Sequence, residues 1–338
     1  MAPSTIDADL GERSPGEEPC EVIAAELAAA NYLAHSRAPA SLRAYAHDWQ
    51  DFLGWCAQHR LAPCPASPWT VGLYLAHLAE RLRPATLQRR LAAIVVEHRR
   101  VGAELDTKAP DLAEVWRGIR RVKGTAKQGK SPILTAELAG IVGSLPATLA
   151  GQRDRAVLLV MFAAALRRSE LVALRCEDLT WTSEGVLVHL VRSKTDLDAQ
   201  GEIKAVPRGR RPDTCPVAAL KAWVMAARLE EGALFRAIDA KGHIAADGIC
   251  DRTVARIVKR AVENHGTCLG LSRAEIAARV KEVSSHSLRA GFATSAAAAG
   301  AAEWEIMRQT GHRKRESVQG YIRAGTAFRG HVGHRLGL

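Results

Sequence analysis

Long apolar runs, paired cysteines and internal repeats are all missing from this chain of 338 residues. No stretch of eighteen or more apolar residues occurs, so a membrane-spanning helix is not expected. The amino terminus is acidic, unlike a secretion signal, which is basic and then apolar. The seven cysteines contain no C-x-x-C pair, which argues against a structural zinc site. Free thiols in a reducing cytoplasm fit this pattern, so we expect a cytoplasmic protein without a metal or other cofactor.

Positive charge outnumbers negative charge outside the amino terminus. Residues 1–30 carry a net charge of −6, whereas the whole chain carries +11, which leaves +17 for residues 31–338. Such an excess favours a polyanionic partner through phosphate contacts and the release of counterions. A solvated basic surface would show the same excess, so charge alone favours nucleic acid without requiring it.

The pattern of turns and apolar stripes divides the chain into four parts. Residues 1–16 are predicted to be a disordered acidic tail, and residues 17–121 a helical domain. In that domain the residues Leu42, Tyr45, Trp49, Phe52, Leu53 and Cys56 form a stripe at helical spacing. Helices are expected from Pro68 to about 82, from 85 to 100, and from Pro110 to about 121.

A basic linker is predicted over residues 122–133. The stretch 117–130 contains six Lys or Arg residues, three glycines and no acid. It is either a plain solvated connection or a segment that lies along DNA.

The remaining residues, 134–338, are predicted to form a second, mostly helical domain. Thr135 is expected to cap one helix, and residues 153–166 to form a strongly apolar one. Residues 185–191 alternate as a strand does, and 203–206 read as its hairpin partner, with Lys194 in or beside the turn. After Pro216 only helices are expected. The predicted fold class is therefore mainly α with a small antiparallel sheet.

Tyrosine is rare, and Tyr321 is the only one after Tyr74. A phenol has a pKa near 10, so it attacks a phosphodiester only with a base and positive surroundings. Arginine matches phosphate oxygens with a planar, permanently charged fork, and Arg167 and Arg289 are the candidates. Of the two histidines in nearby motifs, His286 could accept the phenol proton and His312 could donate to a non-bridging oxygen.

Lys194 could protonate the departing 5′ oxygen. Each of these residues alone is a weak signal, because surface arginines and packed tyrosines are common. Their joint occurrence, in this order and on a basic chain, predicts a DNA strand-transfer enzyme.

At these motifs the chain resembles the tyrosine recombinase, or phage integrase, family. The matching stretches are Ala165-Leu-Arg-Arg-Ser-Glu-Leu171, Arg192-Ser-Lys-Thr195, His286-Ser-Leu-Arg-Ala-Gly291, Gly311-His312 and Tyr321. The amino-terminal half is most similar to the Cre-type members. Ala165 stands where glycine is common, and Thr310 where an aliphatic residue is usual.

The resemblance implies a helical, SAM-like core-binding domain and a mostly helical catalytic domain that close around duplex DNA. It implies that Arg167, Lys194, His286, Arg289 and His312 surround the scissile phosphate, while Tyr321 forms a 3′-phosphotyrosyl bond. Glu170 would be a supporting acid. DNA contacts are expected from five further arginines, namely Arg89, Arg90, Arg99, Arg100 and Arg252.

The partner implied is double-stranded DNA with an inverted-repeat site, bound by a homotetramer on two duplexes. Phe328, Val332 and Leu336 would form one face of a short amphipathic helix. This helix either docks on a neighbouring protomer or folds back on its own domain.

Two other functions fit the same residues. A type IB topoisomerase shares the chemistry but relaxes DNA without choosing a sequence. A catalytically silent DNA-binding regulator would keep the fold, although all six catalytic positions are filled here.

Overall fold

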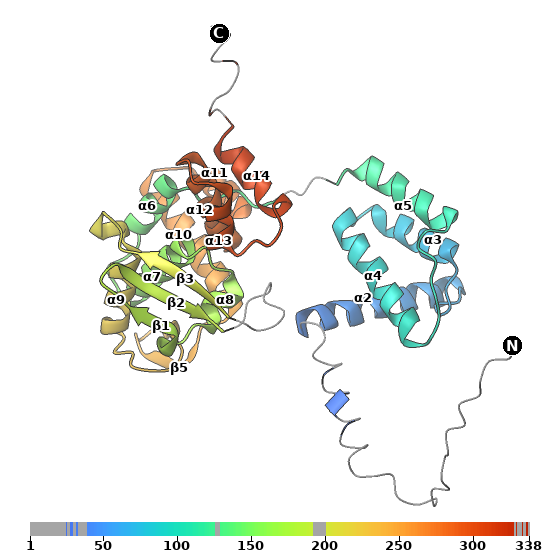
Figure 1. Ribbon diagram of the computed structural model, residues 1–338, viewed down its shortest axis with the longest axis horizontal. Helices are drawn as coiled ribbons and strands as arrows, with labels where there is room; N and C mark the ends of the chain where they lie inside the picture. The colour runs from blue at the N-terminus through green and yellow to red at the C-terminus, as the bar shows by residue number, and fades with distance from the viewer. Residues whose placement is uncertain are drawn as a thin grey trace, which may run out of the picture. The chain divides into compact units, whose positions relative to one another are not determined.

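The computed structural model describes residues 39–125, 129–191 and 201–327, with isolated positions nearer the two ends (25, 28, 29, 32, 329, 333 and 336). The chain divides into two compact units, residues 1–127 and 128–338 (Figure 1). The predicted acidic tail and most of the predicted carboxy-terminal helix fall outside the described residues. Within the described residues, no helix is both long and apolar enough to cross a membrane.

Four helices build the described part of the first unit, and each begins at a proline. They are α2 (Pro39–His59), α3 (Pro68–Ala79), α4 (Pro84–Arg100) and α5 (Pro110–Lys123). Proline suits the first helical position because its missing N–H would lack an intrahelical partner there. At α3 the Ser67 hydroxyl also accepts a hydrogen bond from the Thr70 backbone N–H at 3.1 Å, as expected of an N-cap.

The core of this unit lies where α2, α3 and α4 meet. Phe52, Tyr74, Leu87 and Ile94 are fully buried, and the rings of Phe52 and Tyr74 pack edge to face with centroids 4.9 Å apart. The predicted apolar stripe of α2 contributes Phe52 and Cys56 to this core, whereas its first member, Leu42, is 39% exposed.

The second unit is also mostly helical. Its helices are α6 (Thr135–Gly143), α7 (Leu149–Ala163), α8 (Arg168–Ala173), α9 (Pro216–Ala226), α10 (Asp251–Cys268), α11 (Arg273–Glu282), α12 (His286–Ala298), α13 (Glu303–Thr310) and α14 (Glu316–Gly325). Two predicted boundaries are wrong. The apolar helix α7 begins at Leu149 because Thr148, and no later residue, caps it. Thr135 is the first residue of α6, and its backbone N–H is satisfied by the Ser295 hydroxyl at 3.3 Å.

A three-stranded antiparallel sheet accompanies these helices. Its strands lie in the order β1 (Leu179–Trp181), β2 (Gly185–Leu190) and β3 (Glu202–Pro207). The predicted hairpin is present as β2 and β3, with Val188 opposite Lys204. Figure 1 shows this sheet beside α7 and α9, against which β3 packs.

The prediction that only helices follow Pro216 is wrong. Strands β4 (Arg236–Ile238) and β5 (Ile244–Gly248) pair as a second small antiparallel sheet. Their turn contains Gly242 at φ +89°, a conformation that glycine adopts without steric cost. Both strands are too short to give a clear alternation of apolar and polar residues.

Helix α12 is held against the start of the second unit by direct backbone contact. The Ile133 N–H donates to the Ser287 carbonyl at 3.0 Å. A Cβ on Gly291 would lie 1.8 Å from the Ile133 carbonyl oxygen, so only glycine allows this approach. The contact fixes the first turn of α12, which carries His286 and Arg289.

Candidate active site

The phenol of Tyr321 meets the imidazole of His286. Tyr321 lies on α14, which packs beside α12 (Figure 1), and its hydroxyl oxygen is 3.0 Å from His286 Nε2. Burial raises the pKa of Tyr321, and the nearby positive charge of Arg289 acts against that rise. Desolvation of His286 by the surrounding protein, with the charges of Arg289 and Arg167 nearby, lowers the pKa of His286. At neutral pH the site therefore holds a protonated phenol against an uncharged imidazole.

Arg289 is a buried cation of the site. It projects from the first turn of α12 and is 2% exposed. Its guanidinium donates to the Ala165 carbonyl at 2.5 Å and to the Thr310 carbonyl. Burial and the neighbouring charge of Arg167 lower the pKa of Arg289 to about 10, so the side chain stays charged at neutral pH. The two carbonyls orient the Arg289 guanidinium, and because they are uncharged they do not neutralise its positive charge.

Arg167 stands at the start of α8, where Glu170 holds it. The Glu170 carboxylate accepts from the Arg167 backbone N–H at 2.8 Å and from its guanidinium at 2.5 Å. This double contact caps the helix and fixes the arginine side chain. Ala165, just before, adopts φ +49°, a left-handed conformation that explains why glycine suits this position. The turn places the Ala165 carbonyl against Arg289.

His312 follows the left-handed end of α13. Gly311 closes that helix at φ +63°, and a Cβ there would come within 3.0 Å of the Glu202 carboxylate. The His312 ring lies 6.3 Å from the Tyr321 ring, measured between centroids. Burial, together with four cationic or titratable neighbours (Arg289, Arg167, His286 and Lys204), lowers the pKa of His312 to about 4.

Five of the six predicted catalytic side chains therefore form one cluster. These are Arg167, His286, Arg289, His312 and Tyr321, linked by the contacts and charges above. Glu170 joins them through Arg167. Lys194 lies outside the described residues.

Lys204, which the sequence analysis missed, lies on β3 at the edge of this cluster. It is 1% exposed, pairs with Glu202, and donates to the Arg308 carbonyl at 3.2 Å. Burial lowers the pKa of Lys204. The strand alternation could have revealed Lys204 as a buried residue, because Lys204 and Val206 both lie on the inward face of β3. A charged side chain on an inward face needs a partner.

Comparison with known proteins identifies the family. The phage integrase family model matches residues 136–327, which include every member of the cluster. This chain belongs to the phage integrase family. It is also 38% identical over 314 residues to an "Integrase/recombinase xerD homolog" of Selenomonas ruminantium, covering 92% of this chain and 89% of that protein.

Solved structures of integrases and recombinases share the fold. A lambda integrase dimer bound to a COC′ core site matches with a TM-score of 0.56 and 14% identity, over 88% of this chain and 94% of that one. XerH site-specific recombinase bound to palindromic difH substrate matches with a TM-score of 0.55 and 13% identity, over 80% and 72%. At these identities the likeness concerns the fold alone.

The five arginines predicted to face DNA differ in their surroundings in this integrase-family chain. Arg90 is only 12% exposed in its side chain and pairs with Asp51, while its guanidinium also contacts the Tyr74 hydroxyl. Arg89 is 41% exposed and lies 3.2 Å from the Asp48 carboxylate. Arg99, Arg100 and Arg252 are exposed, with Arg100 paired to Glu97 at 2.8 Å. Arg90 is thus engaged inside its own unit, whereas the other four reach solvent.

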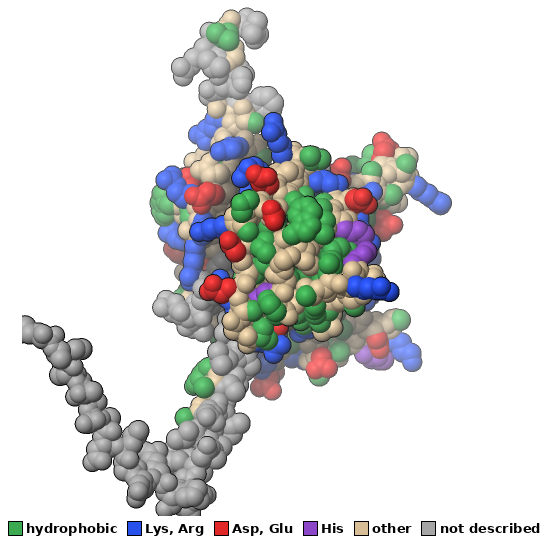
Figure 2. All heavy atoms as spheres, turned by 90° about the vertical axis from the view of Figure 1, so that its right-hand side faces the viewer, with side chains coloured by type: hydrophobic (Ala, Val, Ile, Leu, Met, Phe, Trp, Pro, Cys, Tyr) green, Lys and Arg blue, Asp and Glu red, His purple; other side chains and the backbone are tan. Residues whose placement is uncertain are grey.

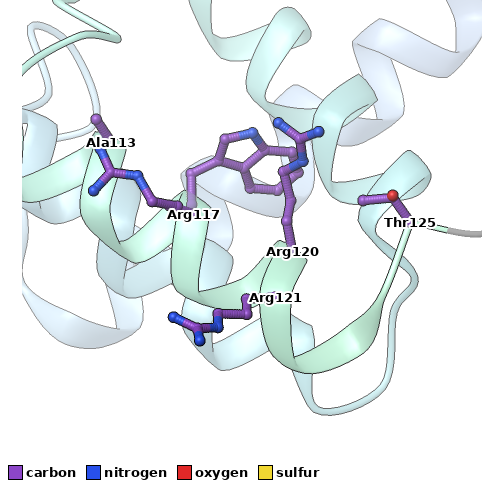
Figure 3. A pocket seen from close by; sticks show the side chains of 6 residues that line it. Ala113, Arg117, Arg120, Arg121 and Thr125 are labelled. Atoms are coloured by element: carbon purple, nitrogen blue, oxygen red, sulfur yellow. The ribbon is translucent and has the colours of Figure 1, made fainter.

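Helix α5 carries further basic residues. Arg117, Arg120 and Arg121 line a shallow hollow with Trp116 and Thr125, and Figure 3 shows the three guanidinium groups spread along the helix. These arginines belong to the basic stretch 117–130 that the sequence singled out. Figure 2 shows several hydrophobic side chains gathered on the face that it presents to the viewer.

Proposed function

We propose that this chain is a site-specific DNA recombinase that cuts and rejoins strands through a covalent bond to Tyr321. Membership of the phage integrase family supports site-specific recombination. The observation that carries the assignment of the nucleophile is the 3.0 Å contact between the Tyr321 phenol and His286 Nε2, beside the buried charge of Arg289.

In the proposed first step, the Tyr321 oxygen attacks the scissile phosphorus. The phenol proton passes to His286 Nε2, a role that an uncharged imidazole within hydrogen-bond reach can perform. The bond between phosphorus and the 5′ oxygen breaks, and Lys194 gives that oxygen a proton. The products are a 3′-phosphotyrosyl link and a free 5′-hydroxyl.

Rejoining reverses these events. The 5′-hydroxyl of a second strand attacks the phosphotyrosyl phosphorus and releases the phenol. Because the phosphotyrosyl link keeps the energy of the original phosphodiester, the exchange of strands requires no separate energy source.

Arg167 and Arg289 would neutralise the non-bridging oxygens as negative charge grows on them. Preorganised donors of this kind make a large contribution to catalysis because they need not reorganise during the reaction. Glu170 supports Arg167 through its two hydrogen bonds, and the two carbonyls that hold Arg289 leave the remaining N–H groups of its fork for phosphate. His312 would donate to a non-bridging oxygen.

The DNA partner would be a duplex with inverted repeats, bound by four copies of the chain on two duplexes. Residues 17–121 would form the core-binding domain, with a Cre-like arrangement, and 134–338 the catalytic domain. Arg99, Arg100 and Arg252 are exposed and the Arg89 side chain is 41% exposed, which suits contacts with phosphates or bases. Arg90 would act indirectly, by holding α4 against α2 through Asp51.

Covalent capture tests the proposal. Purified protein is incubated with a library of nicked duplexes taken from the DNA that flanks its gene, the reaction is stopped with detergent, and the attached DNA is sequenced. Adducts at one inverted-repeat sequence support the recombinase. Adducts at every sequence would instead indicate a topoisomerase-like enzyme. Tight DNA binding without any adduct, with the library covering the flanks completely, would indicate a silent DNA-binding regulator.

A further inference from the structure

Thr310 connects two candidate catalytic residues from a buried position. It is the last residue of α13 and is fully buried. Its backbone carbonyl accepts a hydrogen bond from Arg289. Its side-chain oxygen lies 2.7 Å from His312 Nδ1. One buried threonine therefore contacts Arg289 through its backbone carbonyl and His312 through its side chain.

The hydrogen-bond inventory of the Thr310 hydroxyl fixes the direction of these bonds. A hydroxyl has one hydrogen to donate and two lone pairs to accept with. The Thr310 oxygen lies 2.6 Å from the Ile306 carbonyl oxygen, and a carbonyl can only accept. The hydroxyl hydrogen must point at Ile306, since two oxygens this close without a hydrogen between them repel each other. The contact with His312 Nδ1 must then use a Thr310 lone pair.

We propose that Thr310 is a positioning residue that holds neutral His312 in the tautomer with its hydrogen on Nδ1. Nδ1 donates to Thr310, and the other ring nitrogen, Nε2, carries a lone pair. A neutral imidazole has one N–H and one acceptor nitrogen, and the bond made by one nitrogen decides the state of the other.

The consequence for the reaction rests on the proposed function. In this tautomer Nε2 cannot donate to a phosphate oxygen until it takes up a proton from solvent. The groups around His312 are Arg289 and His286 on α12, Arg167 at the start of α8, Lys204 and Glu202 on β3, and Tyr321 on α14. Most of these groups are cationic or neutral, which disfavours that proton, whereas the charge of a bound phosphodiester favours it. His312 would thus become a donor only when DNA occupies the site.

The tautomer can be observed directly by NMR without DNA. The full-length protein is labelled with ¹⁵N-histidine, long-range ¹H–¹⁵N correlations are recorded near neutral pH, and His312→Gln assigns the His312 signals. The expected spectrum has a protonated Nδ1 and an unprotonated Nε2. A wild-type spectrum with the hydrogen on Nε2 would overturn the proposal.

Three variants separate the hydroxyl from other effects. Thr310→Val keeps the size and the backbone carbonyl that binds Arg289 but removes the hydroxyl, so the Nε2-protonated form should appear. Thr310→Ser keeps the hydroxyl and should restore the wild-type pattern. Thr294→Val is the matched control, since Thr294 is a buried threonine of α12 whose hydroxyl has no hydrogen-bond partner among the residues that the structure describes. An unchanged His312 spectrum in Thr310→Val would contradict the proposal.

Activity gives the second readout. Thr310→Val should slow strand cleavage at saturating DNA about tenfold, by analogy with the loss of a group that orients a metal-ligating histidine, and Thr310→Ser should recover it. A Thr310→Val protein with altered tautomer but wild-type cleavage would show that the tautomer has no role in the reaction. If no DNA is ever cleaved, the proposed function fails. The NMR test of the His312 tautomer does not depend on that outcome, because it is done without DNA.

Discussion

The imidazole nitrogen Nε2 of His286 lies 3.0 Å from the phenolic oxygen of Tyr321, although 35 residues separate the two along the chain. The contact depends on α12 and α14 lying side by side. Gly291 allows α12 to pack closely against the backbone of Ile133. A proton acceptor thus stands ready beside the only tyrosine of the second unit.

Cleavage should weaken as pH falls through the pKa of His286. That pKa lies below its ordinary value because of burial and the nearby arginines, so the ring is neutral at pH 7 and accepts the phenol proton. Protonation at lower pH removes the acceptor. Single-turnover cleavage measured across pH should therefore show an acidic limb in the wild type. In His286→Asn the limb should be absent and the rate at neutral pH lower, and a persisting limb would assign it to another group.

Replacing Arg289 should reduce cleavage strongly. Arg289→Ala removes the buried fork, and the loss of comparable oxyanion donors costs about 3–4 kcal/mol, or on the order of 10²–10³ in rate. Arg289→Lys keeps the charge but lacks the planar fork and should retain only part of the activity.

Single-turnover rates at saturating DNA measure the effect of the Arg289 variants. Arg175→Ala serves as the control, because Arg175 is an exposed arginine of the same unit that pairs with Glu177. Wild-type rates in Arg289→Ala would remove this residue from the site.

His312 should make stability depend on pH. Its pKa is about 4 in the folded protein and close to 6.5 when unfolded. Between these values the unfolded state binds more protons, so the free energy of unfolding rises with pH across this window. The contribution is fully present above about pH 6.5 and is lost as pH falls through 4.

Urea unfolding of wild type and His312→Gln at several pH values tests this dependence. The variant should lose less stability between pH 7 and 4, by on the order of 2 kcal/mol. His59→Gln, which changes an exposed histidine of the first unit, is the control variant. If the free energy of unfolding changed equally with pH in all three proteins, the result would contradict the prediction.

Lys204 should matter for stability. Lys204→Met leaves the Glu202 carboxylate and the Arg308 carbonyl without their donor. Breaking a buried pair costs about 3–5 kcal/mol, and Glu202 is 27% exposed, so we expect roughly 1–3 kcal/mol. Lys259→Met, at an exposed position of α10, is the matched control in chemical denaturation. Equal stabilities of the two variants would show that the pair contributes nothing.

Much of the fold was predictable because local signals agree with it. The prolines at 68 and 110 begin helices as their fixed φ favours, and the alternation in 185–190 and 202–207 forms the hairpin. Strands β4 and β5 were missed because segments of three and five residues give too little periodicity. The start of α7 was predicted four residues too late, at 153, because the cap is Thr148, whose hydroxyl accepts a hydrogen bond from the Gly151 backbone N–H.

The candidate site was predictable only as a set of residue types. Motif spacing brought Arg167, His286, Arg289, His312 and Tyr321 together as candidates. It could not reveal which of them touch, because the contacts depend on how α8, α12, α13 and α14 meet. The role of Thr310 was invisible for the same reason, since its partners come from tertiary contacts and from a helix end. The sequence does not distinguish Arg90 from its neighbour Arg89, yet only Arg90 is mostly buried and paired with Asp51.

Identifying the residue that carries the DNA tests whether Tyr321 is the nucleophile. Trapped protein–DNA adducts are digested with nuclease and protease, and the modified peptide is sequenced by mass spectrometry, with Tyr321→Phe treated in parallel. We expect a nucleotide linked through its 3′-phosphate to Tyr321 in the wild type, no adduct in Tyr321→Phe, and DNA affinity in that variant within a few-fold of wild type. An adduct on any other residue, or an equally abundant adduct in Tyr321→Phe, would contradict it.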